Sequence, residues 1–247
     1  MKDLDEHKKI AVLIDADNAQ YSKIKTIMDE ISAHGHVVIK RAYGDWSSEY
    51  LKNWKVSLNE LAIQPIQQFA YTTGKNSTDA SLIIDAMDLL YSDKFDAFAI
   101  VSSDSDFTKL ASRLRESEIL VFGVGEKKTP IAFRNACDDF IFTENLEPDV
   151  ASAPKVKSVA IKKSENLAVE ALVPVLKKAW KKFQDDDGWA NLSSAGSFVK
   201  RSMPDFDPRT YGVSKFPEVI KILHKHFEMT KYKGKGTVHI VAYRPKN

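Results

Sequence analysis

The sequence predicts an α/β protein, with a parallel sheet built from βαβ units and a smaller winged helix-turn-helix domain after it. Over the first part of the chain, short apolar runs alternate with helical patterns, as βαβ units require. A stretch rich in Pro, Ser, Ala and Lys follows, and this composition favours an extended linker. We therefore place a first domain at residues 1–147, a linker at 148–164 and a second domain at 165–247.

Six apolar runs are the expected strands of the first domain. They are nearly continuous in Val, Ile, Leu and Ala, which is typical of parallel strands that are covered on both faces. Apolar residues with helical spacing mark one helix around Met28, a second over 77–92 and a third around Leu110. The expected strands span 10–14, 37–43, 61–69, 97–101, 119–124 and 140–142.

Three helices and a basic hairpin are expected in the second domain, and this order describes a winged helix-turn-helix. Pro174 should kink the first helix, and residues 233–236 (Lys-Gly-Lys-Gly) are the turn signal of the hairpin. We expect Trp189, Phe206 and Tyr211 in the core rather than as stacking platforms for bases. The expected helices span about 166–183, 192–200 and 214–226, and the expected strands span 227–232 and 237–243.

The two halves of the chain carry opposite net charges. Residues 1–150 contain 17 Lys and Arg against 25 Asp and Glu, a net charge of −8, whereas residues 151–247 contain 19 against 9, a net charge of +10. This split indicates that the second domain holds a polyanion while the first concentrates carboxylates at a site. The alternative is an accidental distribution over solvated surface.

The composition predicts a soluble, cytoplasmic protein. No stretch approaches the roughly 18 apolar residues of a membrane span, and residues 1–9 lack the apolar core of a signal peptide. The single cysteine, Cys137, has no Cys or His partner at ligand spacing. We therefore expect Cys137 to be a small buried residue, without a disulfide or a zinc ion.

Two predicted strands end directly in acidic residues. Asp15 closes the first strand and Asp104 follows the strand at 97–101, and right-handed crossovers bring both ends to one edge of the sheet if these strands are neighbours. Asp79 shares the apolar stripe of the helix at 77–92, so it should point inward from the first turn. A buried charge is costly unless it is neutralised, and a divalent cation shared by the three carboxylates would neutralise it.

The neighbouring polar residues leave alternatives open. Asp106 is either a further metal ligand or only a favourable charge at the N-terminus of the next helix. Asp15 and Asp104 have helix capping as their alternative role. Of Asp17 and Asn18, one should cap the following helix and the other should reach the site, and we assign Asn18 to the site.

Carboxylates without nearby His or Cys select Mg²⁺ or Mn²⁺ rather than zinc. Such ions keep open positions for phosphate oxygens, stabilise charge on the reacting phosphate and lower the pKa of an attacking water. The chemistry that this predicts is phosphodiester hydrolysis.

Asp85 and Asp88 lie off the apolar stripe of their helix, so we expect them to be solvated and outside the centre.

Other residues near this edge are candidates for contacts with a nucleic acid. Ser102 and Ser103 can hydrogen-bond a carboxylate or a phosphate, although small residues at a strand end need no functional reason. Lys75 and Asn76 can meet the scissile phosphate, unless they belong to a plain surface loop. Trp46 can stack on a base, a contact worth about 1–3 kcal/mol, or it can pack on a helix.

Four motifs follow one another in the first domain: Ile14-Asp-Ala-Asp-Asn18, Tyr43-Gly-Asp-Trp46, Gly74-Lys-Asn-Ser-Thr-Asp79 and Ser102-Ser-Asp-Ser-Asp-Phe107. In this order they resemble the NYN domain, the LabA-like branch of the PIN-like nucleases, over residues 10–145. The resemblance implies a Rossmann-like three-layer fold and a metal-dependent ribonuclease activity. Carried over position by position, it implies an acidic centre of Asp15, Asp79 and Asp104, with Asp106 and Asn18 beside it.

The second domain is similar to an OST-HTH/LOTUS domain over about 165–245. The similarity rests on Asp187-Gly-Trp-Ala-Asn-Leu192, on Phe206-Asp-Pro-Arg-Thr-Tyr-Gly212 and on the apolar helix that ends at Phe227. The similarity implies binding of single-stranded or structured RNA, which is G-rich for some members of the family. For other members it implies contacts with a protein partner or with a second copy of the chain. The basic residues expected to bind phosphates, each adding salt dependence rather than sequence choice, are Lys200, Arg201, Arg209, Lys215, Lys231, Lys233 and Lys235.

These observations favour a Mg²⁺- or Mn²⁺-dependent endoribonuclease whose acidic domain cuts RNA that the basic domain delivers. The alternative is a non-catalytic RNA-binding regulator in which the carboxylates hold a structural ion. A third hypothesis is phosphoryl transfer with Asp15 as nucleophile and Asp17 as acid. It is weaker because Asn18-Ala19 replaces the Gly-Thr that follows this start in haloacid-dehalogenase-like phosphatases.

Overall fold

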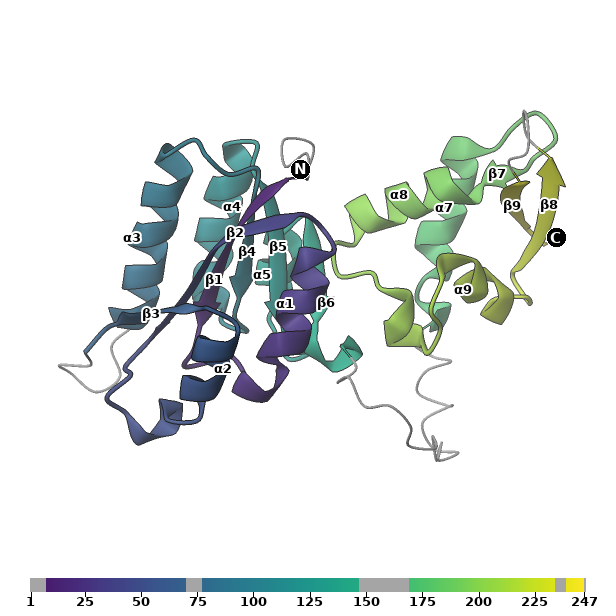
Figure 1. The fold of residues 1–247 in the computed structure, drawn as a ribbon. Coiled ribbons are helices and arrows are strands. Elements are labelled where there is room, and N and C mark those ends of the chain that lie inside the picture. Colours follow the sequence, from purple (N-terminus) through teal and green to yellow (C-terminus); the bar gives the residue numbers. More distant parts are fainter. Residues whose placement is uncertain (1–7, 70–76, 147–168, 234–238, 247) are drawn as a thin grey trace, which may run out of the picture. The chain divides into compact units, whose positions relative to one another are not determined.

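The structure is a computed structural model that describes residues 8–69, 77–146, 169–233 and 239–246 (Figure 1). The chain divides into two compact units, Met1–Ala151 and Ser152–Asn247. The predicted linker at 148–164 lies outside the described residues. Within the described ranges, no helix is long and apolar enough to cross a membrane.

The first unit contains a six-stranded sheet in which every neighbouring pair of strands is parallel. The strand order is β3-β2-β1-β4-β5-β6, so β1 and β4 lie side by side in the middle. The condition for bringing the two acidic strand ends together, that their strands are neighbours, is therefore met. The strands span Lys9–Asp15 (β1), His36–Gly44 (β2), Gln64–Gln67 (β3), Ala97–Val101 (β4), Leu120–Gly125 (β5) and Asp139–Phe142 (β6).

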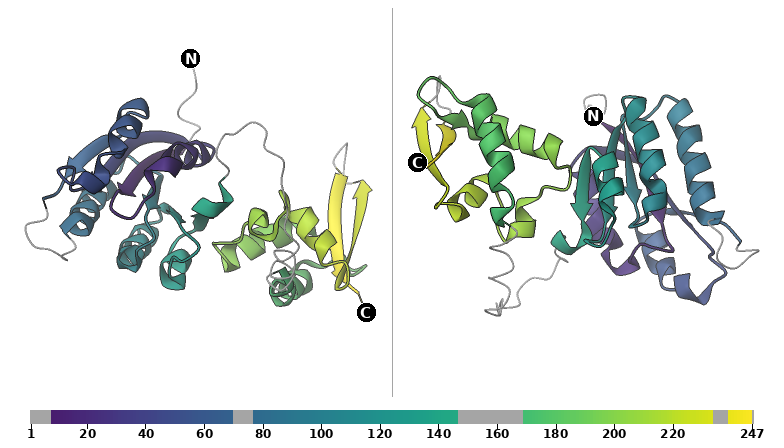
Figure 2. Two further views of the ribbon diagram at one scale, coloured as in Figure 1. Left: turned by 90° about the horizontal axis from the view of Figure 1, so that it is seen from below. Right: turned by 180° about the vertical axis from the view of Figure 1, so that it is seen from behind.

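Helices cover both faces of this sheet, which gives three layers (Figures 1 and 2). Residues of β1 alternate between two cores: Val12 packs with the α1 and α2 side, whereas Leu13 packs with the α3, α4 and α5 side. The predicted α/β fold with a three-layer parallel sheet is confirmed. The helices span Ile24–Ser32 (α1), Trp54–Glu60 (α2), Ser77–Tyr91 (α3), Thr108–Glu116 (α4) and Ile131–Ala136 (α5).

The third predicted strand, 61–69, is too long. Leu61 forms the C-terminal cap of α2, and Ala62 has a φ of 49°, in the left-handed region that few residues other than glycine adopt. The chain therefore turns before β3 begins. The helices α2 and α5 were not among the expected elements.

Asp85 was predicted to be solvated, and this prediction is wrong. Its side chain lies in α3 and is 23 % exposed, and it forms an ion pair with Arg41 and accepts a hydrogen bond from the Tyr43 hydroxyl of β2. Periodicity failed here because the partners of Asp85 come from the sheet rather than from its own helix. Asp88 is exposed as expected.

In its described residues, the second unit contains a three-stranded antiparallel sheet, in the order β7-β9-β8, and three helices. Pro174 does not kink a helix, because α7 begins at Val173 and Pro174 stands in its first turn, where no backbone N–H is needed. The small helical domain with a strand sheet agrees with the prediction. Its elements are Val173–Phe183 (α7), Ala190–Asn191 (β7), Leu192–Ser202 (α8), Phe216–Ile222 (α9), Phe227–Lys233 (β8) and His239–Pro245 (β9).

Aromatic side chains pack the core of the second unit. Phe206 is buried, Tyr211 lies against it with ring centroids 6.0 Å apart, and the Tyr243 hydroxyl donates a hydrogen bond of 2.8 Å to the Leu176 carbonyl. Trp189 is half-buried, and the Arg244 guanidinium lies 4.4 Å from the centroid of its ring. The packing role expected for these aromatics is confirmed for Phe206 and Tyr211. In the first unit, Cys137 is fully buried, as predicted.

Candidate functional site

Asp15 lies at the end of β1 and is almost completely buried, with 1 % of its surface exposed. Its Oδ2 accepts two hydrogen bonds of 2.7 Å, one from the Asn18 Nδ2 and one from the Ser102 hydroxyl. Its Oδ1 is buried and accepts no hydrogen bond within the described part of the chain. A buried carboxylate oxygen without a donor is expensive, so this oxygen marks a place where a cation fits.

Three further carboxylates converge beside it. Asp79, Asp104 and Asp106 each offer one oxygen, and these oxygens lie within 4.8 Å of one another. Asp79 comes from the first turn of α3 and is half-buried, as its place on the apolar stripe predicted. Asp104 and Asp106 come from the turn between β4 and α4. Asp15 is not a member of this triplet, but its charge acts on Asp79, so it borders the same centre.

Ser102 joins the two acidic strand ends. While its hydroxyl donates to Asp15, the same oxygen accepts a hydrogen bond of 3.1 Å from the Asp104 backbone N–H. The Oδ1 of Asp104 in turn accepts a hydrogen bond of 3.0 Å from the Asp106 backbone N–H. Asp104 therefore caps the short helix that follows. Because a carboxylate has two oxygens, the capping role leaves the other oxygen of Asp104 available to a ligand.

The surroundings of Asp15 and Asp79 disfavour the charged form of their carboxylates. Burial raises the pKa of Asp15, although the hydrogen bonds from Ser102 and Asn18 oppose that shift. Burial, together with the charges of Asp15, Asp104 and Asp106, raises the pKa of Asp79 to about 6. Several carboxylates that disfavour one another's charge, with oxygen ligands only, are the donor set that a hard divalent cation requires. The residues present therefore fit Mg²⁺ or Mn²⁺.

Comparison with known domains decides the family. A model of the NYN domain matches residues 9–147, more than half of the chain. The chain belongs to the NYN domain family. A model of the OST-HTH/LOTUS domain matches residues 166–239, so both predicted resemblances are confirmed. The NYN domain has a nuclease-like fold, and the OST-HTH/LOTUS domain suggests RNA binding.

The chain is also similar to solved structures without an assigned function. A protein of unknown function from Vibrio parahaemolyticus is 19% identical, with a TM-score of 0.47, over 57% of this chain and 95% of that chain. An uncharacterized protein from Nitrosomonas europaea is 27% identical, with a TM-score of 0.28, over 41% of this chain and 86% of that chain. No curated protein matches the chain.

Asp17 does not cap the helix after β1, contrary to expectation. The N-terminal cap positions there are Gln20 and Lys23, and neither uses a side-chain hydrogen bond. Asp17 instead accepts a hydrogen bond from the Thr78 side chain at the start of α3, and burial raises its pKa. It therefore ties the first loop of the NYN domain to the helix that carries Asp79. Asn18 lies beside Asp15, where we assigned it, and its catalytic role stays a prediction.

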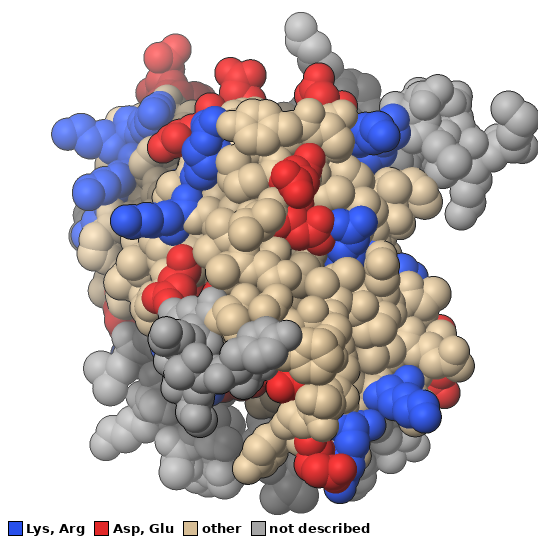
Figure 3. Space-filling view, turned by 90° about the vertical axis from the view of Figure 1, so that its left-hand side faces the viewer, with Lys and Arg blue, Asp and Glu red and all other residues tan. Residues whose placement is uncertain are grey.

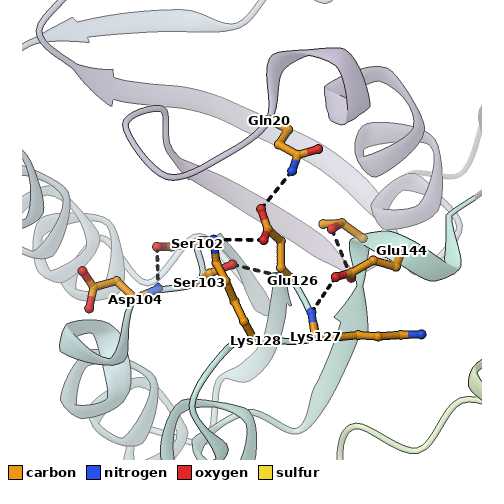
Figure 4. Close-up of polar contacts among 9 residues, drawn as sticks. Gln20, Ser102, Ser103, Asp104, Glu126, Lys127, Lys128 and Glu144 are labelled. Carbon is orange, nitrogen blue, oxygen red and sulfur yellow. Dashed lines mark hydrogen bonds and ion pairs between the residues drawn. The ribbon is translucent and has the colours of Figure 1, made fainter. Parts of the chain in front are cut away.

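A second polar cluster lies at the β5 edge of the centre (Figure 4). Glu126 follows β5. Its carboxylate accepts a hydrogen bond of 2.9 Å from the Gln20 amide and forms an ion pair of 3.0 Å with the Lys128 ammonium. Its backbone N–H donates a hydrogen bond of 2.9 Å to the Ser103 hydroxyl. Our interpretation of the sequence missed Gln20, Glu126 and Lys128. The signal was available, because Glu126 follows a third strand of the same parallel sheet and must reach the same edge.

The other residues predicted to bind substrate in the NYN domain have mixed outcomes. Lys75 and Asn76 lie outside the described residues. Trp46 is half-buried, packs edge-on against Trp54 at a centroid distance of 6.2 Å, and donates its indole N–H to the Ile66 carbonyl at 3.0 Å. The structure thus gives Trp46 a packing role, and stacking on a base stays a prediction.

Among the basic residues predicted to bind phosphates, Arg209 is already occupied. Its guanidinium contacts both carboxylate oxygens of Asp207, at 2.8–3.1 Å. Lys200 is half-buried, with its ammonium 3.4 Å from the Phe206 carbonyl. Arg201, Lys215 and Lys231 are exposed. Lys235 and the side chain of Lys233 lie outside what the structure describes.

Replacing Asp79 by Asn is expected to increase the free energy of unfolding of the metal-free protein by about 1 kcal/mol near pH 8. The raised pKa of Asp79 means that the folded state disfavours its charge, and solvent around this half-buried side chain screens part of the effect. The penalty is absent below the unfolded pKa of 3.8, develops up to about 6 and is complete above it. Urea unfolding of both proteins at low and high pH measures this difference.

The matched control is Asp88→Asn, which removes an exposed charge from the same helix. It should change the stability little at either pH. If Asp79→Asn destabilised the protein at high pH, or matched the control, the folded state would not disfavour the charge of Asp79 as its burial and its neighbouring carboxylates require.

Proposed function

We propose that this NYN protein is a Mg²⁺- or Mn²⁺-dependent endoribonuclease whose second domain binds the RNA. The observation that carries the proposal is the triplet of Asp79, Asp104 and Asp106, with ligand oxygens within 4.8 Å, beside a buried oxygen of Asp15 that has no donor among the described residues. Carboxylates from two neighbouring strand ends and one helix supply all of these oxygens. The nuclease-like fold of the family supports the same conclusion.

In the proposed reaction the protein holds and orients the centre. Asp15, Asp79, Asp104 and Asp106 would hold the cation, which when bound stabilises charge on the phosphate and lowers the pKa of the attacking water. The Asn18 amide and the Ser102 hydroxyl orient Asp15 by donating to its Oδ2. Each of these interactions is in place before substrate arrives, so little reorganisation is needed during the reaction.

The acidic domain needs help to attract a polyanion. One face of the first unit, over α3, shows acidic and basic residues interspersed among uncharged ones (Figure 3). A groove of about 600 Å³ that α3 and β3 line carries Arg41 against Asp85 and Asp88. Neither feature complements RNA phosphates. The +10 net charge of residues 151–247 and the OST-HTH/LOTUS match support RNA binding by the second domain.

A circular single-stranded RNA tests the proposal, because it has no end for an exonuclease. We expect the purified protein to linearise it in Mn²⁺ or Mg²⁺ and to leave it intact in EDTA. Cleavage that persists after complete metal removal would contradict a metal-dependent centre. Tight binding of RNA without any product in any metal would contradict the nuclease and favour a regulator.

The second candidate is a regulator that binds RNA and uses the acidic centre for a structural ion. The burial and the neighbouring charges that raise the pKa of Asp79 favour it, because a cation would offset both effects and stabilise the fold without chemistry. In that case Mn²⁺ should raise the melting temperature while RNA remains uncut. Phosphoryl transfer through Asp15 lacks such support, because Asp15 is 1 % exposed and its Oδ2 already accepts hydrogen bonds from Asn18 and Ser102.

A further inference from the structure

Four lysines occupy one face of α7. Lys177, Lys178, Lys181 and Lys182 are all exposed, and their spacing places them on a single stripe along two turns of the helix. None of the four forms an ion pair with another residue that the structure describes. The opposite side of α7 carries Leu176 and Ala179 in the core, so the lysine stripe is the solvent face.

The neighbouring helix extends this positive surface. Helices α7 and α8 pack together, and neither contains an Asp or a Glu. The Lys182 ammonium lies 5.3 Å from the ring centroid of Phe198 in α8 and 5.9 Å from that of Phe183. Both rings are half-buried, and Arg201 follows Phe198 by one helical turn and is exposed. Cations and partly exposed aromatic rings therefore share one continuous surface.

Helix stability alone does not account for these lysines. Cations in the last turn of a helix interact favourably with its dipole, which explains Lys181 and Lys182 but not Lys177 and Lys178. The nearest acidic residues along the chain are Glu170, which pairs with His226, and residues 185–187 in the turn before β7, where Asp185 accepts a hydrogen bond of 2.7 Å from the Trp189 N–H.

We propose that this surface, which we call the α7–α8 basic face, binds single-stranded RNA. Phosphates contact the lysines and Arg201, and bases stack on the two rings, as in other sites for single strands. The inference rests on the proposed function, and it places RNA on helices rather than on Arg209 or the hairpin. The face is defined by Lys177, Lys178, Lys181, Lys182, Phe183, Phe198 and Arg201.

A membrane surface fits this face less well than RNA. A helix that lies on a bilayer needs an exposed apolar side to insert among the lipids. The apolar side of α7 is already in the core, and the Trp180 indole N–H donates 2.8 Å to the Gly188 carbonyl. The lysines alone would give only weak, salt-sensitive adsorption to anionic lipid.

The test compares two pairs of substitutions in the full chain, each removing two exposed lysines four residues apart. The test pair is Lys178→Gln with Lys182→Gln, and the matched control is Lys221→Gln with Lys225→Gln in the same unit. Binding of a short fluorescent single-stranded RNA is measured in EDTA, so that cleavage plays no part. Circular dichroism and melting temperature show that both variants are folded.

The test pair should weaken binding about tenfold at low salt and lower the slope of log affinity against log salt by about 1.4, since each phosphate contact on a single strand contributes about 0.7. The control pair should retain the wild-type slope. Wild-type binding by the test pair, or an equal loss in both pairs, would overturn the proposal. So would a test pair that loses binding to phosphatidylserine vesicles but not to RNA. If the protein cuts no RNA in Mn²⁺ while the test pair still loses binding, the nuclease proposal fails and this one stands.

Discussion

Replacing Asp104 by Asn is expected to reduce the rate of RNA cleavage in Mn²⁺ by at least about a hundredfold. Asp104 supplies one of the three converging oxygens, and Asn is nearly the same size but carries no charge. The fold should survive, because the Asn side-chain oxygen can still accept the hydrogen bond from the Asp106 N–H that now caps the short helix. Single-turnover cleavage of a labelled RNA measures the effect.

The comparison needs an acidic residue of the same type outside the centre. Asp88→Asn meets this condition, because Asp88 is exposed and is not one of the converging carboxylates. It should cleave RNA at the wild-type rate. An Asp104→Asn protein that is as active as Asp88→Asn would place the chemistry elsewhere.

Replacing Ser102 by Ala should reduce cleavage by about ten- to a hundredfold, the usual cost of losing a group that orients metal ligands. The Ser102 hydroxyl links Asp15 to the Asp104 backbone, so its removal frees both strand ends. Asp15 would also lose one of its two hydrogen bonds. We therefore describe Ser102 as a positioning residue.

The adjacent Ser103→Ala variant is the control, because the Ser103 hydroxyl serves the Glu126 backbone rather than a carboxylate of the centre. The distinguishing measurement is the Mn²⁺ concentration that gives half-maximal activity. It should rise in Ser102→Ala and remain unchanged in Ser103→Ala. A Ser102→Ala protein with lower activity but the wild-type Mn²⁺ dependence would show a structural role only.

The sheet could be predicted from the sequence because its central strands are covered on both faces. Every position of β4, Ala97–Val101, is buried, so the strand appears as an unbroken apolar run with the predicted bounds. Short helices lack such a signal. The seven residues of α2 and the six of α5 are too few to establish a 3.6-residue period, and Leu61, which caps α2, was therefore included in the following strand.

The acidic centre could be predicted in part. Strand ends located Asp15 and Asp104, and helical periodicity placed Asp79 near them. The contacts between side chains could not be inferred in this way, because they join residues far apart in the chain. Ser102 and Asp15 are separated by 87 positions, and Arg41 and Asp85 by 44. No local pattern specifies which of several acceptors such a donor will choose.

The surface of the second unit shows the same limit. Basic residues were identified from their charge, and the neutralising contact of Arg209 with Asp207, two positions before it, was not foreseen. Conversely, the lysines of α7 could not be distinguished by charge alone in a chain with 36 Lys and Arg. Only the helix shows that four of them share one face. Composition predicted the polyanion partner, whereas the structure is needed to place its surface.

The central claim is that carboxylates from β1, α3 and the end of β4 together hold one divalent cation. Crystals of the protein soaked in Mn²⁺ and measured near the manganese absorption edge test it most directly. We expect an anomalous peak within bonding distance of oxygens from Asp15, Asp79 and Asp104, at the place where Asp15 Oδ1 has no donor in the described part of the chain. A peak bound only elsewhere, or these carboxylates without any ion at saturating Mn²⁺, would contradict the account.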